Sequence, residues 1–391
     1  MADKTYDLVY VGAGNKNLIN AMYATKYGGL KVGMFEERHE VGGGWCCEES
    51  PAPGFVANHC SQVHTYNLHH RPIWDDFPEW EEYGAKFAKP RLGPTVVFRE
   101  DDSWIGCYSV WEENYRDKTH RLLSRYSQRD ADTFLELEEK WVKYLYPAVI
   151  EWAFNPPVPF GQPDALEKVI MNPDAGIRPE WLMMSPVQCM RDIFESPEAQ
   201  TIGIRIAQAG GASPIAYGSA IGALLMMFTH MDTIVILGGS HQCAHASQRI
   251  ILENGGEITH SCKVDKIIIE NGKAKGVRLE DGTEINAKLG VVCGANPWQL
   301  VEELTGPEHW DREIVRKVKN IEANWVTISW YTWAFKEQPH YKAENFHPDL
   351  PYSMSITLGR KGLDAMIKES ARRLAGEWPD PEDLQISVYN W

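Results

Sequence analysis

The sequence predicts an α/β fold built around a βαβ unit, with a second domain inserted into it. Three observations predict this fold: a strand, glycine turn, helix and strand at residues 6–37, a long helical middle, and three short strands between residues 264 and 292. Strands that alternate with helices form parallel sheets. With 391 residues, the chain is long enough for two or three domains of about 150 residues each.

The βαβ unit comes first along the chain. The apolar run at residues 8–11 is followed at once by Gly12-Ala13-Gly14 and then by apolar residues at helical spacing. A second apolar run, residues 31–35, ends at Glu36. This order of apolar runs and glycines is typical of a strand, a tight turn, a helix and a second strand.

The helical middle begins near residue 116. Ser127 and Asp130 are typical helix caps, and the pattern stays mostly helical to about residue 230. The elements predicted after it are a helix at 244–254, strands at 267–269, 275–279 and 289–292, and a strand-like alternation at 385–391. The dipeptides Asn271-Gly272 and Asp281-Gly282 predict hairpin turns between these strands.

Composition and charge exclude several classes of protein. The chain is 43% hydrophobic and carries a formal net charge of −15, so it is globular and repels phosphate backbones; we expect no nucleic-acid partner. Its eight cysteines include no C-x-x-C pair, which favours a reducing compartment. The N-terminus is polar, and the apolar run at 220–228 is too short to span a bilayer. We expect a cytoplasmic protein, with peripheral attachment to a membrane left open.

The glycine turn is a candidate dinucleotide site. Backbone N–H groups at a helix N-terminus bind a diphosphate, and glycine lets the backbone come close to it. Gly12 and Gly14 occupy the first two glycine positions of G-x-G-x-x-G, whereas Asn17 occupies the third. Glu36 follows Asn17 by 19 residues, where an acid binds ribose hydroxyls. A plain glycine turn between strand and helix would show the same glycines.

A second glycine cluster follows this acid. Arg38 comes two residues after Glu36, and Gly42, Gly43 and Gly44 follow after three more residues. This layout of acid, Arg, three residues and a glycine pair resembles the flavin (FAD) oxidoreductases of the amine-oxidase and phytoene-desaturase superfamily. In those proteins the loop crosses over the pyrophosphate of FAD.

The resemblance to carotenoid desaturases and carotenoid isomerases extends over nearly the whole chain. The matching segments, in the family's order, are 49–55 (ESPAPGF), 98–104 (FREDDSW), 127–131 (SQRDA), 209–214 (AGGASP), 238–240 (GGS), 254–258 (NGGEI) and 264–297. Each motif is loose, but their fixed order is specific to the family.

The resemblance implies an α/β protein with a Rossmann-like FAD-binding domain (GR2-type) and an inserted α+β substrate domain. Residues 1–70 and 235–305 would form the FAD-binding domain, and residues 71–234 and 306–391 the substrate domain. Val264 would contact the adenine through its backbone. The cofactor-binding residues that the resemblance implies are Gly12, Gly14, Asn17, Glu36, Arg38, Gly42, Gly43, Gly44 and Val264.

Three departures from the family pattern stand out. Asn17 replaces the third glycine, and Asn58-His59-Cys60 stands where the family has Asp-x-Gly. The family also closes its flavin site with a C-terminal glycine-rich segment, which nothing after Gly306 provides. We therefore expect a second polypeptide to complete the flavin site, or this chain to be part of a longer product.

Clustered histidines and cysteines offer further candidates. His59, His64, His69 and His70 match no closed metal site, and no Cys or carboxylate joins them at ligand spacing, so we expect no metal. Since the family brings this segment near the flavin, His59 and His64 are weak candidates for a proton carrier; the catalytic residues are otherwise unknown. Cys46-Cys47 could link a flavin or do redox work, but ordinary packing is favoured.

The resemblance implies an FAD-dependent oxidoreductase, either a desaturase or dehydrogenase or an isomerase. Its substrate would be an apolar, polyene or terpenoid-like molecule, and the chain would be one subunit of a larger, hetero-oligomeric flavoenzyme. Two alternatives stay open. One is a non-redox protein of the flavin fold that binds a lipid or a lipidated partner, and the other is an amine oxidase.

Overall fold

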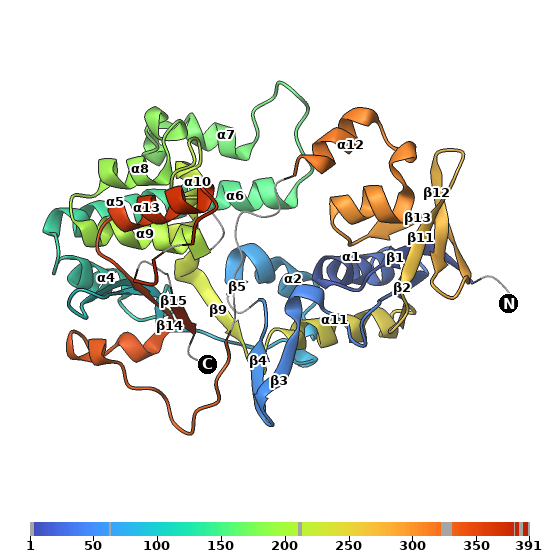
Figure 1. Cartoon of the computed structure of the whole chain (residues 1–391), viewed down its shortest axis with the longest axis horizontal. Coiled ribbons are helices and arrows are strands. Elements are labelled where there is room, and N and C mark those ends of the chain that lie inside the picture. Colours follow the sequence, from blue (N-terminus) through green and yellow to red (C-terminus); the bar gives the residue numbers. More distant parts are fainter. Residues whose placement is uncertain are drawn as a thin grey trace. The chain divides into compact units, whose positions relative to one another are not determined.

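The computed structural model describes residues 4–61, 64–209, 213–321, 331–378, 380–382 and 386–389. The chain divides into two compact units (Figure 1). The first unit comprises Met1–His64, His70–Ala88 and Val235–Ala334, and the second comprises Thr65–His69, Lys89–Ile234 and Phe335–Trp391. The predicted segment at 210–212 and residues 385, 390 and 391 lie outside the described residues.

A six-stranded sheet forms the centre of the first unit, in the order β10-β2-β1-β13-β12-β11. Its strands are β1 (Thr5–Val11), β2 (Val32–Phe35), β10 (Glu257–Thr259), β11 (Val264–Glu270), β12 (Lys273–Leu279) and β13 (Glu284–Cys293). Strand β1 pairs in parallel with β2 and β13, whereas β12 pairs antiparallel with β11 and β13. Asn271 and Gly272 both have positive φ, 52° and 72°, as the tight turn between β11 and β12 requires.

Helices and smaller elements complete the first unit. They are α1 (Asn15–Lys26), β3 (Cys47–Ala52), β4 (Phe55–Asn58), α2 (Arg71–Asp76), α3 (Glu79–Glu82), β6 (Phe87–Ala88), α11 (His241–Glu253), a π-helix at Gln299–Thr305 and α12 (Arg312–Lys319). Helix α11 packs against both α1 and α3. Two short strands, β5 (His64–Thr65) and β9 (Thr233–Ile236), lie where the chain passes from one unit to the other.

The first unit extends beyond the boundaries predicted at residues 71 and 306. The indole of Trp80, in α3, is fully buried and donates from Nε1 to the Cys243 carbonyl (3.1 Å) and to Ser247 Oγ (3.0 Å), both in α11. Past residue 306, Trp310 donates to Thr305 Oγ1 at 2.7 Å. Residues 70–88 and 306–321 therefore group with the first unit, beyond the boundaries predicted at residues 71 and 306.

The second unit contains a four-stranded sheet in the order β15-β14-β7-β8. Its strands are β7 (Leu92–Phe98), β8 (Trp104–Tyr108), β14 (Ser353–Gly359) and β15 (Ile386–Tyr389). Its helices are α4 (Tyr115–Leu123), α5 (Gln128–Lys143), α6 (Leu145–Phe154), α7 (Ala165–Ile170), α8 (Pro186–Ile193), α9 (Pro197–Ala209), α10 (Ala220–Thr229) and α13 (Asp364–Leu374). Strand β14 pairs in parallel with β7, which pairs antiparallel with β8. The sheet and helices together confirm the predicted α+β character of the inserted part.

The helical core of the second unit follows from its caps and apolar faces. Ser127 caps α5 by accepting from the Asp130 N–H, as predicted, and the Asp130 carboxylate accepts from the N–H groups of Glu195 and Ser196 just before α9. The apolar run at 220–228 forms most of α10, whose Leu224, Met227 and Phe228 side chains are buried. Within the described ranges, no helix has both the length and the apolar character needed to cross a bilayer.

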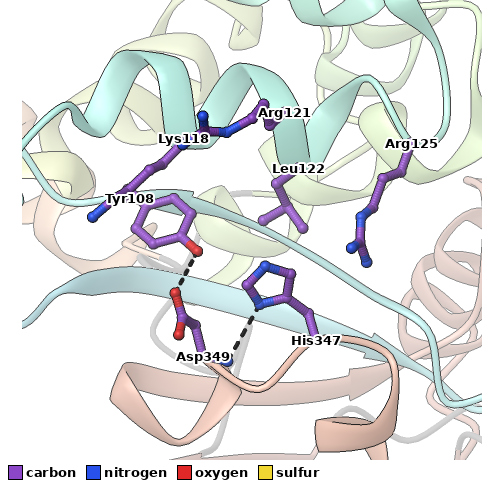
Figure 2. A pocket seen from close by; sticks show the side chains of 7 residues that line it. All are labelled: Tyr108, Lys118, Arg121, Leu122, Arg125, His347 and Asp349. Atoms are coloured by element: carbon purple, nitrogen blue, oxygen red, sulfur yellow. Dashed lines mark hydrogen bonds between the residues drawn. The ribbon is translucent and has the colours of Figure 1, made fainter.

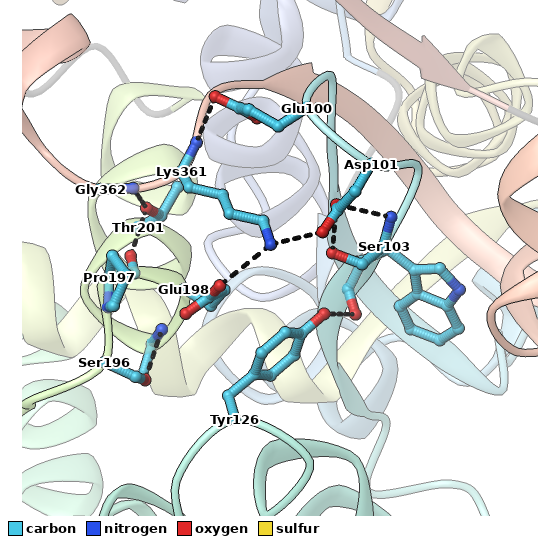
Figure 3. A network of polar contacts seen from close by, with 12 residues as sticks. Glu100, Asp101, Ser103, Tyr126, Ser196, Pro197, Glu198, Thr201, Lys361 and Gly362 are labelled. Carbon is cyan, nitrogen blue, oxygen red and sulfur yellow. Dashed lines mark hydrogen bonds and ion pairs between the residues drawn. The ribbon is translucent and has the colours of Figure 1, made fainter.

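A polar network ties the loop after β14 to the rest of the second unit (Figure 3). Lys361 Nζ lies 2.7 Å from Asp101 Oδ2, in the turn between β7 and β8, and 3.2 Å from Glu198 Oε1 in α9. The Gly362 N–H donates to Thr201 Oγ1 at 2.9 Å. Side chains rather than backbone groups make most of these contacts.

Candidate dinucleotide site

The turn between β1 and α1 is shaped by its two glycines. Gly12 has φ +83°, a conformation that favours glycine, and its N–H donates to the Phe35 carbonyl at 2.8 Å. A Cβ at Gly14 would meet no atom within 4 Å, so the space in front of the first turn of α1 is open. That turn contains no acidic residue and no side-chain cap. The N-terminus of α1 therefore has the features of an anion site.

Glu36 is held beside this turn by two backbone groups. Its Oε2 accepts from the Ala13 N–H at 2.7 Å, and its Oε1 accepts from the Arg38 N–H at 2.9 Å. The side chain lies at the end of β2 and is only 8% exposed. Each carboxylate oxygen has a second lone pair, so Glu36 can still accept from ribose hydroxyls.

Asn17 fills the space that a third glycine would leave. Its amide nitrogen donates to the carbonyls of Val11 (3.0 Å) and Gly12 (2.8 Å), and the side chain is buried. A Cβ at Gly294 would lie 2.6 Å from that nitrogen. Gly294 therefore makes room for Asn17, a relation that spacing in the sequence does not reveal. Asn17 supports the turn, and its contact with a cofactor stays a prediction.

The second glycine cluster lies directly against the first. The Gly42 N–H donates to the Ala13 carbonyl at 2.9 Å, and the Gly42 carbonyl accepts from the Asn15 N–H at 3.1 Å. A Cβ at Gly43, where φ is +56°, would come within 3.0 Å of Gly14 Cα. A Cβ at Gly44 would meet Cys60 Sγ only at 3.9 Å. The tight approach thus depends on Gly42 and Gly43 more than on Gly44.

His241 is a residue that sequence reasoning missed. It begins α11, and its Nε2 lies 2.9 Å from the Val41 carbonyl, next to the glycine loop. A Cβ at Gly42 would come within 3.2 Å of its ring. No local pattern connects His241 with a loop 200 residues earlier.

Arg38 and Val264 lie at the edge of the cradle formed by Gly12, Gly14, Asn17, Glu36 and Gly42–Gly43. The backbone after β10 runs alongside them: the Cys262 N–H donates to the Glu36 carbonyl and the Ser261 N–H to the Arg38 carbonyl, both at 2.8 Å. Val264, two residues further on, is buried. The Arg38 guanidinium is about half exposed and lies 3.8 Å from Glu48 Oε1.

Of the three clustered histidines whose side chains the structure describes, it brings together His64 and His70. His64 Nδ1 lies 2.7 Å from His70 Nε2, both rings are buried, and the His70 ring stacks on Trp80 with centroids 5.6 Å apart. His59 is separate, with Nε2 3.7 Å from Glu48 Oε2. The side chain of His69 lies outside the described residues. In the described part of the chain, no three His, Cys, Asp or Glu side chains are placed to hold a metal ion.

Cys47 is anchored by packing. Its Sγ donates to Asn58 Oδ1 at 2.8 Å and accepts from the His241 N–H at 3.3 Å. Burial raises the pKa of the neighbouring Cys46 thiol, which keeps it protonated at neutral pH. Both arrangements support the packing interpretation of this cysteine pair.

Comparisons with known proteins bear on this site. No family model matches the chain. It is 23% identical over 383 residues to a subunit of the limonene dehydrogenase of Castellaniella defragrans, an alignment that covers 93% of this chain and 66% of that protein. It is 25% identical over 350 residues to a 4,4'-diapophytoene desaturase of a Methylomonas species, an alignment that covers 86% of this chain and 63% of that protein. The chain is thus similar in sequence to a limonene dehydrogenase subunit and to a diapophytoene desaturase. It spans about two thirds of the length of these two relatives.

Solved structures are similar to this chain in fold. A double mutant of putrescine oxidase matches with a TM-score of 0.50 and 17% identity, over 81% of this chain and 63% of that one. The PF1083 protein from Pyrococcus furiosus matches with a TM-score of 0.51 and 17% identity, over 81% and 65%. The predicted fold class, with its Rossmann-like domain, is confirmed.

Proposed function

We propose that the chain is the FAD-binding part of an oxidoreductase that desaturates, dehydrogenates or isomerises an apolar, polyene or terpenoid-like substrate. The observation that carries the proposal is the cradle: the Glu36 carboxylate is fixed on two backbone N–H groups beside the open space at Gly14. The names of the relatives, a limonene dehydrogenase subunit and a diapophytoene desaturase, support the reaction and the substrate class.

Each part of the cradle has a role in this proposal. The N-terminus of α1 and the turn at Gly12 and Gly14 would hold the pyrophosphate, and Glu36 would accept from the ribose hydroxyls. The backbone of Gly42 and Gly43, packed on the turn, would cover the cofactor on one side. Bound FAD would supply the hydride acceptor, and the protein would bind, orient and exclude water.

The cradle accommodates such a cofactor. The space beside Gly14 is open, since a Cβ there would meet no atom within 4 Å, and the buried Glu36 carboxylate keeps acceptor capacity beyond its two backbone bonds. Arg38 and Val264 complete the proposed binding set at the edge of the cradle. Gly44 belongs to the same loop but makes no equally tight contact.

His59 and His64 are the proposed proton carriers. His64 is buried and can pass a proton to His70, since their ring nitrogens lie 2.7 Å apart. His59 is about one-third exposed, and its Nε2 lies 3.7 Å from Glu48 Oε2. The two residues therefore represent different routes, one through a buried pair and one from the surface.

We further propose that additional polypeptide completes the flavin site, either a second subunit or the rest of a longer product of which this chain is part. The relative from Castellaniella is named a subunit, and the alignment leaves about one third of it unmatched. Copurification of the native protein followed by mass spectrometry tests this. Peripheral contact with a membrane and a cytoplasmic location stay predictions.

Flavin spectroscopy tests the proposed function. We expect the native protein, purified together with any polypeptide that accompanies it and titrated with FAD, to show a bound-flavin absorption spectrum. That spectrum should bleach anaerobically on addition of limonene or of a polyene such as 4,4'-diapophytoene. Failure to take up FAD would overturn the proposal and leave the non-redox lipid-binding alternative. Bleaching by an amine such as putrescine, with none by the apolar substrates, would favour the amine-oxidase alternative.

A further inference from the structure

We propose that the second unit carries a separate binding site for a phosphate group. A cavity of about 250 Å³ lies beside α4, and the loop that precedes β14 contributes His347 and Asp349 to its lining (Figure 2). All of its lining residues belong to the second unit, whereas the dinucleotide cradle belongs to the first. The proposal therefore does not depend on the proposed redox function.

Three cations line this cavity from one side. Lys118 and Arg121 lie in α4, and Arg125 follows two residues after its end. Lys118 and Arg121 are three residues apart, which places them on the same face of α4, where like charges repel one another. A row of cations is notable in a chain with a net charge of −15. A bound anion would relieve this repulsion.

The basic side chains in the lining have N–H donors that are not used within the described part of the protein and are available to a ligand. Lys118 is hydrogen-bonded to Glu112, which neutralises part of its charge. The Arg121 side chain makes no hydrogen bond or ion pair with the residues that the structure describes. Arg125 donates from one terminal nitrogen to the Phe346 carbonyl at 3.0 Å. A guanidinium has five N–H donors, so Arg121 and Arg125 can both bind an oxyanion.

The carboxylate in the lining is already engaged. Asp349 Oδ2 accepts from the Tyr108 hydroxyl at 2.7 Å and lies 3.7 Å from a terminal nitrogen of Arg91. His347 Nδ1 accepts from the Asp349 N–H at 3.3 Å, which leaves the proton of the neutral ring on Nε2. Burial lowers the pKa of His347, so the ring is neutral at neutral pH. The lining thus offers two arginines, and a lysine paired with Glu112, against one carboxylate that Tyr108 and Arg91 already engage.

The volume of the cavity and the side chains that line it indicate a small, anionic ligand. Drug-sized ligands occupy pockets of about 300–1,000 Å³, so a cavity of about 250 Å³ suits a small group. The paired N–H donors of an arginine guanidinium match the spacing of phosphate oxygens. Leu122 and the Tyr108 ring line the cavity beside the arginines and offer apolar contact. The phosphate group could be a free phosphate or the head group of an anionic lipid, which share this chemistry.

Calorimetric titration of the full chain with inorganic phosphate tests the site. We expect binding that weakens about fivefold in Arg121→Ala, because an exposed charge pair contributes modestly, and that disappears in the double variant Arg121→Ala/Arg125→Ala. The matched control is Arg129→Ala, which removes an exposed arginine paired with Glu195 at 2.8 Å, outside the cavity lining. Thermal melting verifies that each variant is folded.

Vesicle sedimentation distinguishes the two sources of phosphate. Phosphatidylcholine vesicles with and without phosphatidic acid are incubated with wild type, the double variant and the Arg129→Ala control. Binding in either arm that the double variant abolishes and the control retains supports the proposal and identifies the source. The site does not exist if neither probe binds, or if both bind the double variant as tightly as wild type.

Discussion

The cradle of the first unit and the cavity of the second hold their polar groups in opposite ways. In the cradle, backbone N–H groups and one carboxylate meet at a turn set by Gly12 and Gly14. In the cavity, long side chains of α4 face a loop more than 200 residues later in the sequence. A site made of backbone tolerates little change in shape, whereas a site made of side chains can adjust.

A similar contrast separates a backbone contact in the sheet of the first unit from a side-chain network in the second unit. A Cβ at Gly276, in β12, would lie 2.0 Å from the Ile285 carbonyl oxygen, so backbone meets backbone in the first unit. In the second unit, Lys361 joins Asp101 and Glu198 through flexible side chains (Figure 3). Substitutions that probe the two kinds of contact should differ strongly in effect.

The largest effect is expected for Gly276→Ala. Its methyl group would displace the β13 backbone, and we expect the free energy of unfolding to fall by about 3 kcal/mol, at the upper end for overpacking. Urea denaturation measures it. The control is Gly290→Ala in β13, where a Cβ meets nothing within 4 Å and the change should stay within about 0.5 kcal/mol. Equal stability of the two variants would contradict the close backbone contact at Gly276.

A smaller effect is expected for Trp80→Phe. The substitution removes the indole N–H that binds the Cys243 carbonyl and Ser247 Oγ, and leaves a gap in a fully buried site. We expect a loss of about 2 kcal/mol in the free energy of unfolding. Trp378→Phe serves as control, because Trp378 is 90% exposed and should show no measurable loss. If Trp80→Phe also left the free energy of unfolding unchanged, the Trp80 hydrogen bonds would not anchor α3 on α11 as described.

The smallest effect is expected for Lys361→Met. Its contacts with Asp101 and Glu198 are partly exposed and screened, so we expect a loss of about 0.5 kcal/mol at pH 7. The Lys361 hydrogen bond lowers the pKa of Asp101 below its ordinary value of 3.8. Its stabilisation is therefore present above that value and is lost as the pH falls through the lower pKa of the folded state.

Chemical denaturation at pH 7 and pH 3 measures this dependence. The stability difference between wild type and Lys361→Met should narrow at pH 3. Lys317→Met, which breaks an exposed pair with Glu313 on α12, is the control and should change stability less at pH 7. A difference that grows at pH 3 would contradict the assignment to Asp101.

The cradle could be predicted because its signals are local. Gly12, Gly14 and Glu36 belong to one strand, turn, helix and strand, and the spacing alone places them together. Strand β14 was missed, because its pairing with β7 joins residues about 260 positions apart. The α11 helix begins at His241, three residues before the predicted start, since Cys47 Sγ accepts its N–H. Contacts between residues that lie about 200 or more positions apart leave no local pattern in the sequence.

The affinity for FAD of Glu36 variants tests the central claim most directly. Fluorescence titration should show that the free energy of FAD binding in Glu36→Ala is less favourable by about 1.5–3 kcal/mol, because hydrogen bonds to a charged carboxylate are lost. Glu37→Ala, one residue further along and exposed, should bind FAD like wild type. Unchanged affinity in Glu36→Ala would contradict the account, because the carboxylate at the glycine turn would then have no part in binding the cofactor.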